Sequence, residues 1–137
     1  MIVVRIARLR KLAAHLMHGK LGHDRFDFWS FNTGNQKCGT AGCAIGECPI
    51  VFPSDWMFEK LWYGTPVLRR GNMRNLHPFI SAEVFFGITA EECGHLFNPG
   101  FQIPALYGGK RLGGKATRYK VAHNIDEFIK IKTKNNK

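Results

Sequence analysis

The chain has 137 residues, of which 45% are hydrophobic and 12% aromatic. This length and composition fit one globular domain with its own core and exclude a disordered chain. No apolar run approaches the about 18 residues that a membrane span needs, and four cysteines are too few for a dense disulfide scaffold. We therefore expect a cytoplasmic protein with reduced thiols and no membrane association.

The formal net charge of +10 is unevenly distributed along the chain. Residues 1–25 carry six basic and one acidic side chain, residues 26–107 carry five and seven, and residues 108–137 carry nine and two. Both ends are therefore cationic around a nearly neutral middle. This asymmetry indicates an anionic partner, with nucleic acid as the first candidate and an acidic host protein as another. A solvated face that keeps the protein soluble is the alternative.

The first predicted element is an amphipathic helix. Apolar residues recur at helical spacing from Ile2 to Met17, with Arg5, Arg8 and Arg10 between them. Gly19 is a typical end for such a helix. We expect the apolar stripe to pack on the domain and the arginines to form a cationic patch.

The next sixty residues give weaker signals. Residues 26–37 are first aromatic and then turn-forming, which predicts a loop with buried rings. Gly39 to Cys48 is expected to be a short helix that Thr40 caps and Pro49 ends. Residues 49–78 contain several prolines and glycines and predict irregular structure with at most a short hairpin. This region is a candidate insertion.

The last part of the chain predicts three helices. In "ISAEVFFGITAEECGHLFNPG", the first helix ends at Gly87, and Thr89 and Glu92 form the capping box of the second. After a glycine-rich basic loop, Thr117 caps a final helix. Residues 132–137 are expected to be a flexible basic tail. The sum is a mainly α, compact single domain over residues 1–137 with about five short helices.

The segment "NQKCGTAGCAIGECP" has three interpretations. A zinc site is disfavoured because Cys38, Cys43 and Cys48 are each separated by four residues, so that on a helix their thiols point apart. Cys93 and His95 would complete a site only if the fold brought them near. In the preferred interpretation, the glycines and small thiols allow close packing of neighbouring segments. We therefore predict no metal and no cofactor.

The third interpretation is a cysteine-dependent hydrolase or peptidase. Cys38 would be the nucleophile, since a helix N-terminus favours the thiolate. Gln36 resembles the oxyanion-donating glutamine that precedes the nucleophile in papain-like and bacteriocin-leader peptidases. His77, His95 or His123 would serve as the base. The sequence lacks the run of strands that delivers the histidine in those folds, so binding is favoured over catalysis.

Three segments in the same order resemble an uncharacterised family of small phage and bacterial proteins. They are "CGTAGCAIGE", "FFGITAEECGHLFNPG" and "ATRYKVAHNIDEFI", and the opening "LRKLAAHL" is also similar. Together they cover roughly half of the chain. The resemblance implies a compact, phage-borne helical protein without an assigned activity, with a role in host takeover or evasion of host defence.

The basic loop before the final helix is the predicted binding surface. "GGKRLGGKA" lacks the Ser or Thr and the preceding strand of a phosphate-binding P-loop, so nucleotide hydrolysis is not expected. Basic side chains can still hold a phosphate backbone, and Tyr107 and Tyr119 can stack on bases. The predicted contact residues are Lys110, Arg111, Lys115, Arg118 and Lys120, with Arg5, Arg8 and Arg10 as a second patch.

These observations predict a small basic phage-type accessory protein that acts by binding an anionic partner. The anionic partner is nucleic acid, a nucleotide or an acidic host protein. Two alternatives remain open: the hydrolase described above, and a virion or assembly component, which would self-associate or accompany capsid proteins.

Overall fold

The computed structural model describes residues 4–21, 25–26, 41–42, 44–59, 65–69, 78–98, 100–113 and 116–135. Within these ranges the protein is mainly helical, as predicted, with short strands in two pairs. The helices are α1 (Ile6–His18), the 3-10 helix η1 (Ile45–Glu47), α2 (Cys48–Val51), α3 (Pro78–Phe86), α4 (Ala90–Phe97), α5 (Pro104–Tyr107) and α6 (Arg118–Asn135). The strands are β1 (Arg25–Phe26), β2 (Ala41–Gly42), β3 (Trp56–Glu59) and β4 (Thr65–Leu68).

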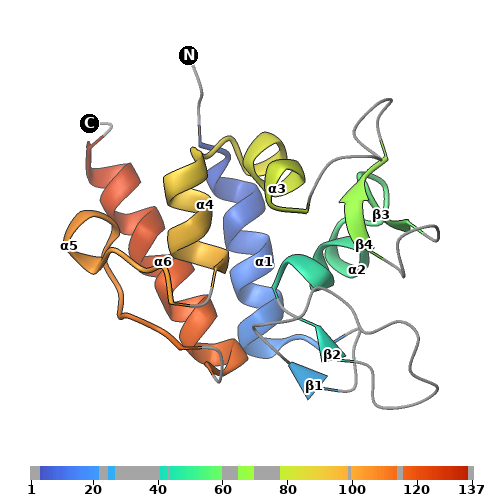
Figure 1. Ribbon diagram of the computed structural model, residues 1–137, viewed down its shortest axis with the longest axis horizontal. Helices are drawn as coiled ribbons and strands as arrows, with labels where there is room; N and C mark the ends of the chain where they lie inside the picture. Colours follow the sequence, from blue (N-terminus) through green and yellow to red (C-terminus); the bar gives the residue numbers. More distant parts are fainter. Residues whose placement is uncertain are drawn as a thin grey trace.

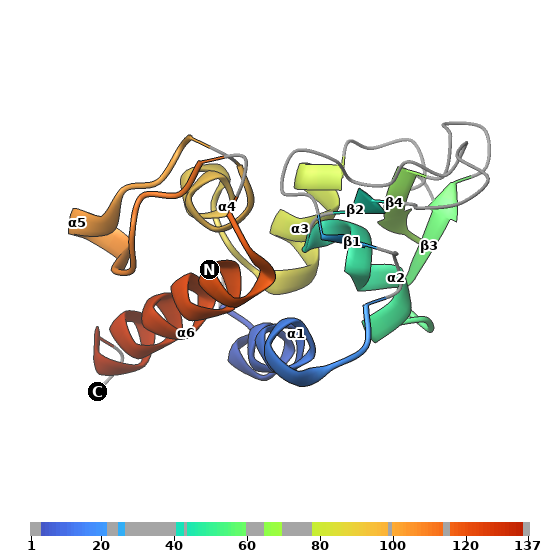
Figure 2. The same ribbon diagram turned by 90° about the horizontal axis from the view of Figure 1, so that it is seen from below.

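The two longest helices, α1 and α6, lie side by side and form one layer (Figures 1 and 2). The start of α6 lies beside the end of α1, where the Arg118 guanidinium donates a hydrogen bond of 2.6 Å to the Leu16 carbonyl. The two helices therefore run in opposite directions. Helices α3 and α4 cover this layer, and the β3–β4 hairpin lies on the side away from α6 (Figure 2). No helix in the described ranges is both long enough and apolar enough to cross a bilayer.

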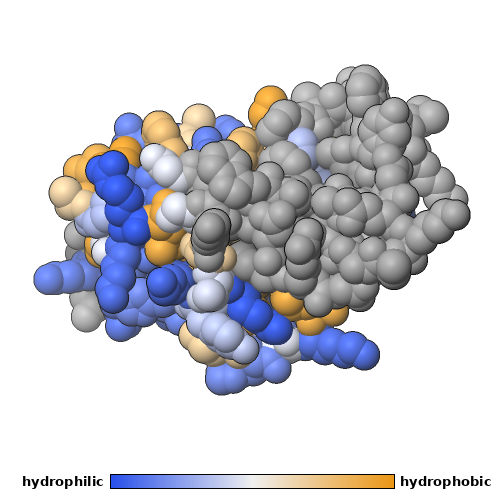
Figure 3. Space-filling view, turned by 60° about the horizontal axis from the view of Figure 1, so that its bottom comes forward, coloured by the Kyte–Doolittle hydropathy of each residue, from blue (hydrophilic) through white to orange (hydrophobic). Residues whose placement is uncertain are grey.

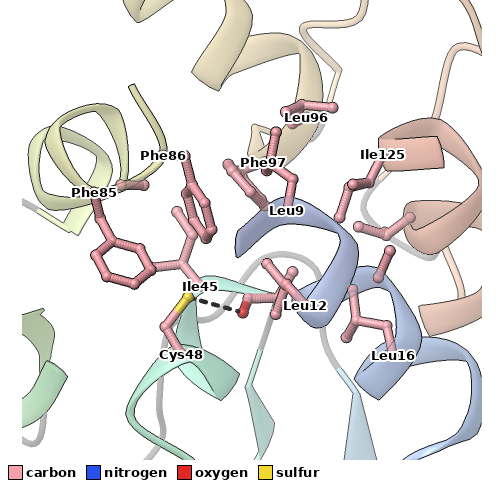
Figure 4. Close-up of a cluster of buried hydrophobic side chains, with 14 of the residues drawn as sticks. Leu9, Leu12, Leu16, Ile45, Cys48, Phe85, Phe86, Leu96, Phe97 and Ile125 are labelled. Atoms are coloured by element: carbon pink, nitrogen blue, oxygen red, sulfur yellow. Dashed lines mark hydrogen bonds between the residues drawn. The ribbon is translucent and has the colours of Figure 1, made fainter. Parts of the chain in front are cut away.

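The core lies where α1 meets these covering elements (Figure 4). Leu9, Leu12 and Leu16 of α1 are fully buried. Phe86 of α3 stacks on Phe97 of α4 with ring centroids 5.9 Å apart. Burying each such side chain contributes about 1.5–3 kcal/mol relative to leaving it exposed, so these contacts fix α1 beneath α3 and α4.

Local signals explain the predicted ends of α3 and α4. Gly87 follows α3 with a φ of 66°, a conformation that favours glycine. The capping box of α4 is present: the Glu92 N–H donates to Thr89 Oγ1 at 3.1 Å, and the Thr89 N–H donates to Glu92 Oε1 at 2.9 Å. Both predictions are confirmed.

The predicted helix over residues 39–48 is wrong. Ala41 and Gly42 form β2, which pairs in parallel with β1, and helical structure begins only at Ile45. Pro49 lies in the first turn of α2 and does not end a helix. Proline fits there because its fixed φ is already helical and its missing N–H is not needed in the first turn. Thr40, the predicted cap, lies outside the described residues.

The region 49–78 contains α2 and the predicted hairpin. Strands β3 and β4 pair antiparallel, with Trp56 opposite Leu68 and Glu59 opposite Thr65. Most of the loop predicted over residues 26–37 lies outside the described part of the chain.

At the C-terminus, helix α6 continues to Asn135, so Lys132 and Lys134 are helical. The flexibility expected of residues 132–137 stays a prediction. Lysine is a good helix former, and Lys132 pairs with Glu92 of α4.

Candidate nucleic-acid interface

A hollow of about 220 Å³ opens between the loop after α5 and the first turns of α6. We call it the α6 hollow; it is lined by Lys110, Leu112, Tyr119, Lys120, His123 and Asn124. Tyr119 is 53% exposed. The hollow therefore combines two ammonium groups with an aromatic face that solvent reaches.

The loop that carries Lys110 is fixed by a buried asparagine. Asn124 Oδ1 accepts a hydrogen bond of 2.8 Å from the Lys110 N–H, and Asn124 Nδ2 donates one of 2.8 Å to the Lys110 carbonyl. Gly109, with a φ of 75°, lies so close to Asn124 that a Cβ atom there would overlap the amide. Gln102 accepts from the Leu112 N–H at 2.9 Å. The Lys110 backbone is thus held in place while its side chain remains exposed.

A line of charged side chains extends from the hollow along α6. We call it the α6 stripe; it consists of Lys120, His123, Glu127, Lys130 and Lys134. Their alternating spacing of three and four residues places them on one helix face. Glu127 is the single carboxylate of the stripe and lies 3.7 Å from His123 Nε2 and 3.8 Å from Lys130 Nζ. The stripe keeps an excess of positive charge.

The far end of the stripe borders a shallow groove between α1 and α6. This groove of about 250 Å³ is lined by Arg10, Ile129, Lys130, Thr133 and Lys134. Figure 3 shows hydrophilic side chains gathered on the side of the molecule that α1 and α6 form. Arg10, from the cationic N-terminal segment, therefore adds its charge to that of α6.

Comparison with protein-family models, curated proteins and solved structures finds no match to this chain. The resemblance to the phage and bacterial family therefore remains a prediction from its motifs.

Two of the predicted contact residues, Arg118 and Tyr107, form hydrogen bonds with other parts of the protein. The Arg118 guanidinium donates to the carbonyls of His15, Leu16 and Gly19 and so caps the C-terminal end of α1.

The Tyr107 hydroxyl donates to Glu91 Oε1 at 2.5 Å. Burial of the phenol and this neighbouring carboxylate raise the pKa of Tyr107 to about 12. Tyr107 is not among the residues that line the α6 hollow.

The remaining predicted contacts are divided among several places. Arg111 is exposed beside the hollow, and Lys115 lies outside the described residues. Of the second patch, Arg10 lies in the groove beside the stripe, whereas Arg5 and Arg8 line a separate cavity near α3. The structure thus brings together Lys110, Lys120 and Tyr119.

The residues of the hydrolase hypothesis are only partly described, since Cys38, Gln36 and His77 lie outside the described ranges. His95 is fully buried, and its Nδ1 accepts from the Ile103 N–H at 2.8 Å. Burial lowers the pKa of His95, with the backbone of Gly108 partly offsetting this effect. His123 lies on the exposed face of α6. These two histidines therefore occupy different environments.

The described end of the cysteine segment belongs to the core. Ala44, Ile45 and Cys48 are fully buried, and the Cys48 thiol donates to the Ala44 carbonyl at 3.8 Å (Figure 4). Cys93 is also buried, and its thiol donates to the Phe79 carbonyl at 3.5 Å. The part of the chain that the structure describes holds no cluster of three side chains suited to a metal ion.

One buried polar pair was not predicted. Glu47 of η1 is fully buried, and its Oε1 lies 2.7 Å from Nε2 of His15 on α1. The two residues are 32 positions apart in the sequence. His15 lies in "LRKLAAHL" and Glu47 in "CGTAGCAIGE", but neither segment indicates that the two side chains meet. Only the packing of η1 on α1 reveals the pair, which joins the cysteine segment to the first helix.

Proposed function

We propose that the protein binds single-stranded nucleic acid along the α6 hollow and the α6 stripe. The exposed ring of Tyr119, which lines the same hollow as Lys110 and Lys120, carries this proposal. Proteins that bind single strands combine aromatic side chains, on which bases stack, with cations that follow the backbone. The hollow offers the aromatic side chain, and the stripe offers the cations.

The arrangement of the charges supports a polymer as the partner. Lys120 and Lys134 are 14 positions apart on one helix, so the stripe extends over about 21 Å at 1.5 Å per residue. A single phosphate would engage only one end of such a row. A strand that runs along the stripe can bring different phosphates to Lys120, Lys130 and Lys134, and Arg10 adds a further cation at the end.

The preference for a single strand follows from Tyr119. In a duplex the bases are stacked on one another, and their faces are closed to a side chain on the surface. The motif resemblance supports a phage-type accessory role for such binding, in host takeover or evasion of host defence.

The proposal is tested by fluorescence anisotropy with labelled single-stranded DNA and RNA of about ten nucleotides, a length within the range of known single-strand sites. Tyr119→Leu removes the stacking surface and should raise Kd by about 5- to 150-fold, the equivalent of about 1–3 kcal/mol per stacked base. Lys110→Gln combined with Lys120→Gln should also weaken binding, because two phosphate contacts are lost.

Lys11→Met is the matched control. Lys11 lies on α1 with its Nζ 5.4 Å from the centre of the Phe52 ring, away from the hollow, and methionine keeps the aliphatic stem. Its Kd should stay close to that of the original protein. No binding at low salt, or an equal loss in all three variants, would contradict the proposed interface.

A further inference from the structure

A second cavity, of about 250 Å³, lies where the start of α1 meets α3 and the β3–β4 hairpin. We call it the arginine cavity; it is lined by Arg5, Arg8, Ser54, Asp55, Leu68, Arg69, Val84 and Phe85. These residues come from three parts of the sequence, and four of them belong to the region 49–78. Neither the α6 hollow nor the α6 stripe shares a residue with it.

Two of its guanidinium groups are held by contacts with the protein. Arg8 Nη1 donates to the Phe85 carbonyl at 2.7 Å, and the guanidinium lies 4.1 Å from the centre of the Phe85 ring. Arg69 Nε donates to the Pro53 carbonyl at 2.9 Å. The bond of Arg69 uses one of the five N–H donors that an arginine has. The bond to Pro53 fixes the position of the Arg69 guanidinium and so orients its remaining N–H donors.

The third guanidinium belongs to Arg5, at the N-cap of α1. Its backbone N–H donates to the Phe86 carbonyl at 2.8 Å, which ties this end of the helix to α3. Arg5 and Arg69 are both exposed, so a ligand can reach them from solvent. The lining contains three arginines and one aspartate, so the formal charge of the cavity is positive.

The carboxylate is Asp55, and its place among the arginines is informative. Among the described residues it forms no ion pair within 4.0 Å, although the same cavity contains three cations. Its oxygens therefore remain acceptors for another group. Ser54, beside it, offers a hydroxyl that can donate or accept.

We infer that the arginine cavity binds a phosphate monoester of a small molecule that also carries hydroxyl groups, such as a sugar phosphate. Guanidinium groups match the geometry of phosphate oxygens and bind them in bidentate fashion. Asp55 and Ser54 then receive the hydroxyl groups, and Leu68 and Val84 contact the carbon skeleton. The volume is below the about 300–1,000 Å³ of sites for drug-sized ligands, which fits a small ester.

Isothermal titration calorimetry of the full chain with three probes tests the inference: ribose 5-phosphate, inorganic phosphate and ribose. Saturable binding should be strongest for ribose 5-phosphate, weaker for inorganic phosphate and absent for ribose. Arg5→Gln and Arg69→Gln should each weaken binding of both phosphates by about tenfold or more, as expected for a lost charged hydrogen bond. Lys20→Gln, which removes one charge beyond the other end of α1, should leave both affinities unchanged.

Asp55→Ala separates a recognition role from a structural one. Removing the carboxylate should strengthen binding of inorganic phosphate, because a like charge is lost, and should abolish the advantage of ribose 5-phosphate over it. Three outcomes overturn the inference: no saturable binding of either phosphate by the unaltered protein, equal weakening by Lys20→Gln, or an unchanged ratio of affinities in Asp55→Ala. The arginine cavity shares no residue with the α6 hollow or the α6 stripe. A negative result for nucleic-acid binding therefore does not contradict phosphate binding in the cavity, and a negative result for phosphate does not contradict nucleic-acid binding.

Discussion

His95 shows how the fold alters the chemistry of a single side chain. The imidazole is fully buried on α4, its ring centre lies 5.2 Å from that of Tyr107, and its Nε2 has no hydrogen-bond partner of good geometry among the described residues. A charged imidazolium in this place would lose its hydration without a compensating anion. Burial therefore lowers the pKa of His95 below its ordinary value of 6.5.

This lowered pKa predicts a loss of stability at mildly acidic pH. Above about pH 6.5 the histidine is neutral in both the folded and the unfolded chain, so it adds no pH dependence. As the pH falls below this value, the unfolded chain takes up a proton that the folded chain does not, and the free energy of unfolding decreases by up to about 1.4 kcal/mol per pH unit. Urea unfolding at about pH 7.5 and pH 5.5 measures the difference.

His95→Asn is the comparison that assigns the effect. Its Oδ1 can still accept the Ile103 N–H, as Nδ1 does in the original protein, but the side chain no longer titrates. The variant should lose less free energy of unfolding between the two pH values than the original protein. An equal loss in both proteins would show that other groups cause the acid sensitivity.

The loop between α5 and α6 depends on Asn124 as a bridge. Asn124→Ala removes two hydrogen bonds to the Lys110 backbone and should lower the free energy of unfolding by about 1–3 kcal/mol. Gly109→Ala should have a similar effect, because its φ of 75° is unfavourable for alanine and its Cβ would displace the Asn124 amide.

Chemical unfolding of both variants and of the double variant checks this. Because the two changes disrupt the same contact, their effects should not add. Asp126→Ala, at an exposed position of α6, is the control and should change the free energy of unfolding by less than about 0.5 kcal/mol. Full additivity of the two loop changes would contradict a shared bridge.

Elements with local signals could be predicted from the sequence, and elements that depend on distant partners could not. The capping box of Thr89 and Glu92 and the glycine at position 87 defined α3 and α4 correctly. The helix expected over residues 39–48 failed because Ala41 and Gly42 pair with a strand fifteen or more positions earlier. The same holds for the candidate site. Lys110, Lys120 and Tyr119 were predicted from the sequence, whereas the hydrogen bonds by which Asn124 holds the Lys110 backbone next to α6 were not.

In the whole molecule, the two cationic ends of the sequence come together. Helices α1 and α6 lie side by side (Figure 2). Arg10 from the N-terminal segment therefore lies in one groove with Lys130 and Lys134 from the C-terminal segment. Arg118 fixes this arrangement by capping α1 from α6. The sequence showed the charge at both ends but not that the ends are neighbours.

The salt dependence of nucleic-acid binding tests the central claim most directly. Contact of Lys110, Lys120, Lys130 and Lys134 with four phosphates of a single strand predicts a slope of about −3 in a plot of log Kobs against log salt concentration. Lys110→Gln combined with Lys120→Gln should reduce this slope by about 1.4, whereas Lys11→Met should leave it unchanged. A slope near zero, or the same slope in all three proteins, would contradict binding through α6.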